Sequence, residues 1–300
     1  MRRRAWFEIH DHRLFPGFLR DLVTEALEAM WNARDFYGPV AARLRLALHE
    51  SGATQVVDLC SGGGGPWLGF SHHVAGEDGS APAVLLTDKY PNLNAFQHVK
   101  DTTGRAIDFY PEPVDAMRIP SALTGFRTMF STFHHFQPDE ATAILRHAFD
   151  QRQGIAIFEG AKCDWRTLAA VFVVPLLALR LAPQIQPFRW ARIFWTYCLP
   201  VIPFTLWFDG LLSCLRSYSQ ADMRELVEGL RDENYSWEIG DERRGLVSVR
   251  YLVGCPINRS GKVSRAEIVE IAEMRRPVQQ SPDGPVSGKD YATAAVASRR

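Results

Sequence analysis

Four consecutive glycines, Gly62 to Gly65, lie between a short apolar run and Pro66. The run Val56-Val57-Asp58-Leu59 is typical of a buried strand, and it contains an acidic residue near its end. Glycine has no Cβ, so the loop backbone can turn sharply and lie against a ligand. Pro66 suits the first position of a helix, whose N-terminal amides attract anionic groups. The order strand, glycine loop, helix therefore predicts a site for a nucleotide-type ligand.

Two other ligand classes are excluded by the spacing of these glycines. The dinucleotide fingerprint GxGxxG needs a third glycine at a position that is Trp67 or Leu68 in this chain. The phosphate loop GxxxxGK[ST] needs a lysine after the glycines, and none follows here. The loop therefore has neither pattern.

Five segments in order resemble the motifs of the class I S-adenosylmethionine-dependent methyltransferases. They are Val56 to Gly64, Thr87-Asp88, Val114 to Pro120, Met129 to Phe136 and Gln153 to Glu159. The family usually has glycine where this chain has Cys60. The resemblance implies that the carboxylate of Asp88 accepts hydrogen bonds from both ribose hydroxyls of S-adenosylmethionine. It also implies that Asp115 binds the adenine amino group, with Asp108 and Glu112 as alternatives. The implied cofactor-binding residues are Asp58, Cys60, Gly62, Gly64, Asp88, Lys89, Asp115, Ala116 and Ser131.

The elements that must position these residues follow from the hydrophobic pattern. Short apolar strands alternate with helices between about residues 55 and 160, which predicts an α/β, doubly wound parallel sheet. Strands at 237–239 and 246–253 with a short polar connection predict an antiparallel hairpin. The resemblance implies a Rossmann-like, seven-stranded methyltransferase sheet with an antiparallel edge strand. We expect an N-terminal helical lid at 1–50, a methyltransferase domain at 51–256 and a disordered tail at 275–300.

Three residues near the strand ends could move a proton. A phenol, alcohol or amine acceptor needs its proton removed, and His134, His135 and Glu159 are the candidates for this step. The alternative is that the segment Phe133 to Phe136 only forms the floor of the cofactor site. Glu159 is interpreted as a base or as a substrate anchor.

An apolar insert at 163–216 stands where the family needs only a short link. Its first apolar run, 167–179, is shorter than the roughly 20 residues that span a bilayer, and its second contains Pro200, Pro203 and Asp209. It is predicted to be a helical cap over the acceptor, a membrane-contacting hairpin, or a plain hairpin or dimer interface. A buried charge must be paired or functional, so Asp209 and Arg216 are expected to bind the acceptor or each other. Trp207 and Tyr37 are further substrate candidates.

Composition restricts the partners of the chain. Lys and Arg together number 34, as do Asp and Glu, so no nucleic-acid partner is expected. Five scattered cysteines form no disulfide framework and favour the cytoplasm, with the inner membrane surface as an alternative location. His10-Asp11-His12 offers only adjacent ligands, which make a poor metal cage, so no metal is expected.

The predicted function is methyl transfer from S-adenosylmethionine to a small hydrophobic acceptor. One alternative is a non-catalytic S-adenosylmethionine-binding or membrane-associated protein with the same fold. Another is a different S-adenosyl-type group transfer. Fold alone does not determine the methylated atom.

Overall fold

A seven-stranded sheet forms the centre of the computed structural model, which describes residues 8–257 apart from 13, 76–80, 105 and 246. The strand order is β3-β2-β1-β4-β5-β7-β6. The first five strands are parallel, whereas β7 runs antiparallel to both β5 and β6. The strands are β1 (Gln55–Asp58), β2 (Ala83–Leu86), β3 (Ile107–Phe109), β4 (Phe126–Phe130), β5 (Ile155–Glu159), β6 (Tyr235–Arg244) and β7 (Val247–Pro256). The predicted fold class is confirmed, and the terminal hairpin is longer than expected.

Helices cover both faces of the sheet because its parallel strands are apolar on both sides, as the fully buried β4 and β5 illustrate. One face packs against α2 (Ala41–Ser51), α3 (Trp67–Val74) and α4 (Leu93–Thr102). The other face packs against α5 (Pro138–Asp150) and α9 (Gln220–Val227). Helix α2, which was expected in the lid, therefore belongs to the sheet core.

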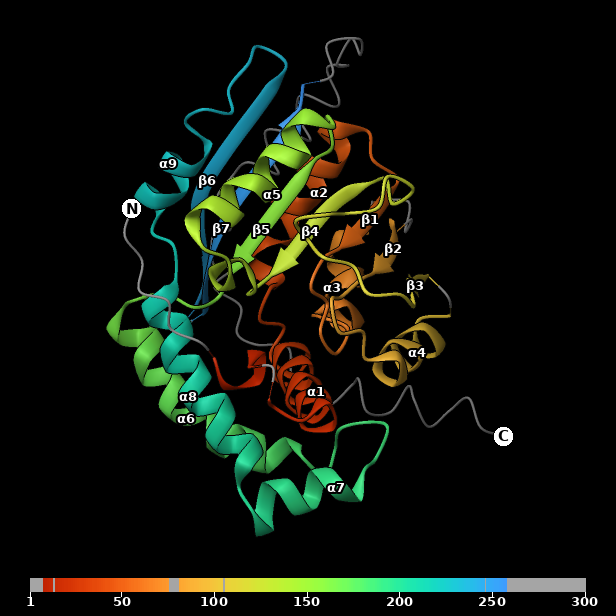
Figure 1. Cartoon of the computed structure of the whole chain (residues 1–300), viewed down its shortest axis with the longest axis vertical. Helices are drawn as coiled ribbons and strands as arrows, with labels where there is room; N and C mark the ends of the chain where they lie inside the picture. Colours follow the sequence, from red (N-terminus) through yellow and green to blue (C-terminus); the bar gives the residue numbers. More distant parts are fainter. Residues whose placement is uncertain (1–7, 13, 76–80, 105, 246, 258–300) are drawn as a thin grey trace, which may run out of the picture.

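A third group of helices is built from α1 (Gly17–Ala33) and from the insert. The insert forms α6 (Trp165–Leu181), α7 (Trp190–Ile193), a π-helical turn η4 (Phe194–Cys198) and α8 (Val201–Arg216). Leu22 and Ala26 of α1 pack with Ala178 of α6 and Leu206 of α8 in a core of their own. Figure 1 shows these helices together below the sheet.

The insert is helical, as predicted. Among the described residues, no single helix has the length and apolar composition to cross a membrane. Trp190–Cys198 and Val201–Arg216 meet that test only when taken together, and they are bent by 72° relative to each other. The predicted tail at 275–300 lies outside the described residues.

Candidate functional site

The loop after β1 is held by a buried carboxylate. Asp58 is the last residue of β1, and its two oxygens accept hydrogen bonds from Ser61 Oγ and Thr128 Oγ1, both at 2.6 Å. Burial raises the pKa of Asp58 to about 7, although these hydrogen bonds oppose the rise. Asp58 thus ties the glycine loop to β4, and both of its oxygens are engaged inside the protein.

Backbone geometry explains the glycines of the loop. Gly62 and Gly64 have φ angles of +57° and +119°, which side chains rarely adopt. A Cβ at Gly63 would lie 2.8 Å from the carbonyl oxygen of Thr24, so only glycine allows α1 to approach this closely. Cys60, where the family usually has glycine, also has a positive φ of 59°.

Acidic side chains follow the next two strands at the same edge of the sheet. Asp88, after β2, accepts hydrogen bonds from the backbone N–H of Gly62 at 2.8 Å and of Tyr90 at 2.7 Å. Asp115, after β3, accepts from Lys89 Nζ and from the N–H of Met117, both at 3.0 Å. Burial would raise the pKa of Asp115, but these two donors outweigh it and lower the pKa. The glycine loop, Asp88 and Asp115 therefore lie at the carboxyl ends of β1, β2 and β3, respectively.

Glu28 of α1 supplies a test of whether S-adenosylmethionine fits here. It is 7% exposed, and its Oε1 makes no hydrogen bond. This oxygen lies 3.5 Å from the position that a Cβ on Gly64 would take. Burial raises the pKa of Glu28 well above its usual value. A buried acceptor without a partner beside the glycine loop fits the ammonium group of the cofactor's amino-acid end.

The side chains of Tyr37 and Ser131 are in contact at the carboxyl end of β4. Ser131 Oγ accepts from the hydroxyl of Tyr37 at 2.6 Å and from the N–H of Gly160 at 3.0 Å. Tyr37, a predicted substrate residue, is 1% exposed and packs edge-on against Phe130. In this arrangement its hydroxyl supports the turn that follows β4.

A second group of polar residues lies just beyond the carboxyl ends of β4 and β5. We name this group the histidine–carboxylate cluster. Its members are Glu8, His10, His134, His135, Glu159, Asp209 and Arg216. The cluster unites the short helix η3 (Phe133–His135) and the end of β5 with η1 (Ile9–Asp11) and α8. It contains all three predicted catalytic residues and two of the predicted substrate residues. Glu8 and His10 join them from the N-terminal segment.

His134 lies between two carboxylates. Its Nδ1 is 2.7 Å from Glu159 Oε2, and Glu159 Oε1 accepts from the N–H of Phe133 at 2.7 Å. Its Nε2 lies 3.3 Å from Glu8 Oε1 but makes no hydrogen bond. Burial alone would lower the pKa of His134, but Glu159 and Glu8 outweigh it and raise the pKa to about 10. Both ring nitrogens therefore face carboxylates, and neither is open to an acceptor while Glu8 is in place.

Glu8 is the centre of the cluster. Its Oε1 accepts from Ser213 Oγ at 3.0 Å, and its Oε2 lies 3.6 Å from His135 Nε2. Burial would raise the pKa of Glu8, but the neighbouring histidines lower it to about 2. Arg216 lies 3.7 Å from Glu8 and donates to the carbonyl oxygen of His135 at 2.7 Å.

Asp209 fixes the N-terminal segment to α8. Its carboxylate accepts from the N–H of Ile9 at 2.6 Å and lies 2.7 Å from His10 Nδ1. The expected pairing of Asp209 with Arg216 is wrong for the described residues, because Asp209 pairs with His10 and Arg216 with Glu8. Trp207 lies outside the cluster, with its ring 6.0 Å from that of Phe172.

The sheet has seven strands, and β7 runs antiparallel to its neighbours β5 and β6, in agreement with the seven-stranded sheet and antiparallel strand that the resemblance implies. The fold is the α/β, Rossmann-like fold that the sequence predicts. No family model matches the chain, and no curated protein matches it.

Solved structures with a similar fold include several methyltransferases. One is human N-acetylserotonin methyltransferase with S-adenosylmethionine, at 12% identity and a TM-score of 0.47, covering 81% of this chain and 57% of that one. Another is mitomycin 7-O-methyltransferase MmcR, at 15% identity and a TM-score of 0.44, with coverages of 73% and 54%. The pyocyanin biosynthetic protein PhzM has 12% identity and a TM-score of 0.44, with coverages of 75% and 56%. The chain thus spans about half the length of these proteins.

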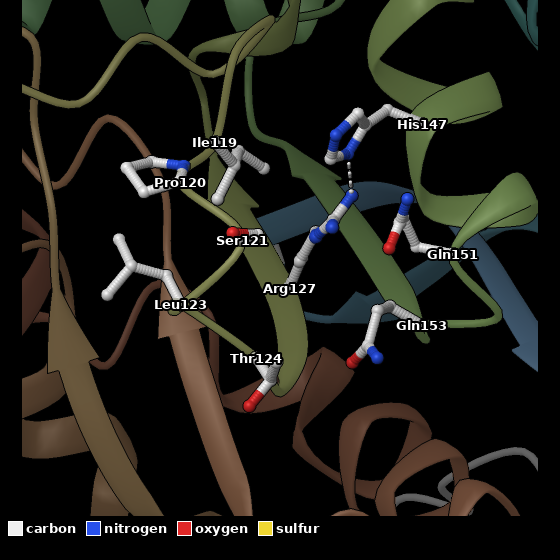
Figure 2. A pocket seen from close by; sticks show the side chains of 9 residues that line it. All are labelled: Ile119, Pro120, Ser121, Leu123, Thr124, Arg127, His147, Gln151 and Gln153. Atoms are coloured by element: carbon white, nitrogen blue, oxygen red, sulfur yellow. Dashed lines mark hydrogen bonds between the residues drawn. The ribbon is translucent and has the colours of Figure 1, made fainter.

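A pocket at the opposite, amino end of the strands contains none of the predicted site residues (Figure 2). In Figure 2, Arg127 of β4 points toward His147 of α5, and its Nη1 lies 2.8 Å from His147 Nδ1. Gln151 and Gln153 also line the pocket. Burial lowers the pKa of Arg127 to about 10. No local pattern marks this pair, because its two residues are 20 positions apart.

A buried ion network was also missed. Glu25 of α1 is paired with Arg192 of α7 and lies 3.2 Å from Arg189. Asn92, the N-cap residue of α4, donates to Glu25 at 3.2 Å. Glu25 is 1% exposed and Arg192 is fully buried. The network joins α1 to the insert and to the sheet domain.

Proposed function

We propose that the protein transfers a methyl group from S-adenosylmethionine to a small hydrophobic acceptor. One observation carries the proposal: two sets of polar residues lie at the carboxyl ends of strands of one parallel sheet. The glycine loop, Asp88 and Asp115 follow β1, β2 and β3, respectively. The histidine–carboxylate cluster lies just beyond the carboxyl ends of β4 and β5. Ligands of open α/β sheets bind at this edge.

Each residue has a role that follows from its position. Asp88 binds the ribose, Asp115 the adenine and Glu28 the ammonium group. When bound, S-adenosylmethionine supplies an electrophilic methyl group, and much of the acceleration comes from alignment of the acceptor. His135 is the most accessible imidazole of the cluster, at 18% side-chain exposure, so it contacts the acceptor. The hydrogen bond between His134 and Glu159 orients the His134 ring, whose centroid lies 4.4 Å from that of His135.

The test is calorimetric titration with S-adenosylmethionine, followed by transfer of labelled methyl groups to lipid extracts. Asp88→Asn keeps one oxygen for the Gly62 N–H but cannot bind two hydroxyls as a carboxylate does, so affinity should fall about tenfold or more. Asp101→Asn, which changes an exposed residue of α4, is the control. No binding by the wild type, or equal binding by both variants, would refute the proposal. Binding without transfer would favour the non-catalytic alternative.

We propose a lipid bilayer as the source of the acceptor, because the insert carries an exposed apolar face. Phe172 and Leu176 of α6 are 60% and 65% exposed, and Phe204 of the neighbouring α8 is 53% exposed. Trp190, where α7 begins, is 77% exposed. These exposed large apolar side chains support contact with a membrane interface.

The charges of the insert support an anionic bilayer. Between Trp165 and Leu215 the only acidic residue is the buried Asp209, whereas Arg166 and Arg180 are exposed. Basic residues beside an apolar face are attracted to anionic headgroups.

Co-sedimentation with phosphatidylglycerol vesicles, compared with phosphatidylcholine vesicles, tests this proposal. The wild type should pellet with the anionic vesicles, and Leu176→Glu should reduce pelleting severalfold. Leu93→Glu changes an exposed leucine on α4 and should have no effect. A wild type that stays in the supernatant would refute the proposal. A dimer that dissociates in Leu176→Glu would assign the face to a second copy of the chain.

A further inference from the structure

We propose that Glu8, His134 and His135 form a binding site for a divalent transition metal ion, with Zn²⁺ as the best match. Ligand atoms from these three residues all lie within 4.8 Å of one another. They come from two segments that are far apart in the sequence, the N-terminal residues and the turn after β4. This site differs from the expectation, drawn from His10-Asp11-His12, that the protein holds no metal.

The distances match those within a zinc coordination sphere. Zn²⁺ binds imidazole nitrogen and carboxylate oxygen at about 2.0–2.2 Å, so neighbouring ligands of a tetrahedral site lie about 3.3–3.5 Å apart. His134 Nε2 is 3.3 Å from Glu8 Oε1, and His135 Nε2 is 3.6 Å from Glu8 Oε2. The two imidazole rings have centroids 4.4 Å apart. A small shift of Glu8 would allow one ion to contact all three side chains.

An unsatisfied nitrogen points to a ligand at this place. His134 is 2% exposed, and its Nε2 makes no hydrogen bond although it faces Glu8. Its other nitrogen, Nδ1, is held by Glu159 at 2.7 Å. A carboxylate behind a histidine is the usual support of a metal-binding imidazole, because it fixes the ring and makes the other nitrogen more basic. Glu159 is therefore a positioning residue for His134.

The charge of the cluster also favours a divalent cation. It contains three carboxylates, Glu8, Glu159 and Asp209, against the single guanidinium of Arg216. Histidines that bind a metal are neutral, so in the metal-bound form the three carboxylates and Arg216 sum to −2, which an ion of charge +2 balances. Borderline-soft Zn²⁺ suits two imidazoles and one carboxylate, whereas Mg²⁺ and Ca²⁺ prefer oxygen ligands alone.

Three protein ligands leave one position of a tetrahedral ion open. That arrangement is typical of catalytic zinc sites, in which a water or substrate oxygen takes the fourth position. This role deepens the proposed methyl transfer and rests on it: an acceptor hydroxyl bound to the ion would lose its proton more readily. His135 would then contact the acceptor through the ion.

Metal analysis of the full-length protein tests the site without any cofactor or acceptor. After removal of metal by chelator, dialysis against Zn²⁺ should restore one tightly bound equivalent. Co²⁺ in its place should give the visible absorption of a tetrahedral site. His135→Ala should lose this equivalent, and Glu159→Gln should weaken Zn²⁺ binding tenfold to hundredfold. The matched control is His72→Ala with His73→Ala, a pair of adjacent exposed histidines on α3.

The outcomes separate this inference from the proposed function. Absence of a stoichiometric equivalent in the wild type, or its retention in His135→Ala, overturns the metal site. Loss of the equivalent in the His72/His73 control alone assigns binding to the surface pair and also overturns it. Titration with S-adenosylmethionine reports on the Asp88 end of the sheet independently, so either proposal can fail while the other holds.

Discussion

Replacement of Asp58 by Asn should remove a pH dependence of stability that this single carboxyl causes. Asp58 is 1% exposed, and burial raises its pKa to about 7 from an ordinary value of 3.8. Asn fits the same hydrogen bonds, because Thr128 can still donate to Oδ1. The new amide can donate to Ser61 Oγ, whose own proton can turn to the carbonyl oxygen of residue 58 at 3.1 Å. The substitution therefore removes the titrating group and keeps partners for Thr128 Oγ1 and Ser61 Oγ.

The magnitude and sign follow from linkage between protonation and folding. The folded state holds the proton more tightly than the unfolded state, so the stability that this proton provides is fully present below about pH 4. It is lost as the pH rises from about 4 through about 7. A difference of about three pKa units corresponds to a total loss of about 4 kcal/mol. The part of this loss of stability that falls between pH 5 and pH 8.5 is about 2–3 kcal/mol.

Urea denaturation of the wild type and of Asp58→Asn at several pH values from 5 to 8.5 measures this pH-dependent part of the stability. Other titrating groups are common to both proteins and cancel in the difference of the two unfolding free energies. As the pH rises from 5 to 8.5, the unfolding free energy of Asp58→Asn should increase by about 2–3 kcal/mol relative to that of the wild type. Asp101→Asn should give a constant difference. A constant difference for Asp58→Asn as well would mean that Asp58 is ionised in the folded protein at pH 5, which would refute the reasoning.

Two further substitutions test the contacts of α1. Gly63→Ala places a Cβ 2.8 Å from the Thr24 carbonyl oxygen, so unfolding free energy should fall by about 1–3 kcal/mol, whereas Gly229→Ala, with open space around it, should change little. Equal effects in the two alanine variants would argue against close packing of α1 on the loop. Arg192→Met leaves Glu25 buried with fewer partners and should cost about 3–5 kcal/mol in urea denaturation. Adding Glu25→Gln should recover part of this loss, and strictly additive effects would contradict a coupled pair.

Local pattern was sufficient to predict the sheet domain. The runs Val56–Leu59 and Ile155–Glu159 are apolar over the length of a strand, and both are buried strands in the structure. The glycine loop was predictable because a positive φ and a close approach each demand glycine at a single position, as Gly64 and Gly63 illustrate. The positive φ of Gly64 is a local feature, whereas the close approach at Gly63 involves Thr24 of α1, which is distant in the sequence.

The candidate site was predictable only where its residues follow a strand. His134, His135 and Glu159 were found because they lie at strand ends, but Glu8 has no local pattern that marks it. Glu8 and its partner Ser213 are 205 positions apart, and only the packing of the insert brings them together. The same reason explains why the pairing of Asp209 with Arg216 was wrong. Both residues belong to α8, and their local sequence does not show that the N-terminal segment supplies His10 to Asp209 and Glu8 to Arg216.

The helical layer of α1 and the insert contacts both halves of the candidate site. Helix α1 lies against the glycine loop at Gly63 and joins the insert through Glu25 and Arg192. The residues just before α1 join α8, because Asp209 accepts hydrogen bonds from the N–H groups of Ile9 and His10. Because these contacts belong to one continuous layer with its own apolar core, movement of α1 away from the loop would disturb the insert. The insert is therefore connected to the glycine loop through α1 and to the histidine–carboxylate cluster through α8. These two connections account for the buried charges of the insert, because each charge is paired with a residue outside it.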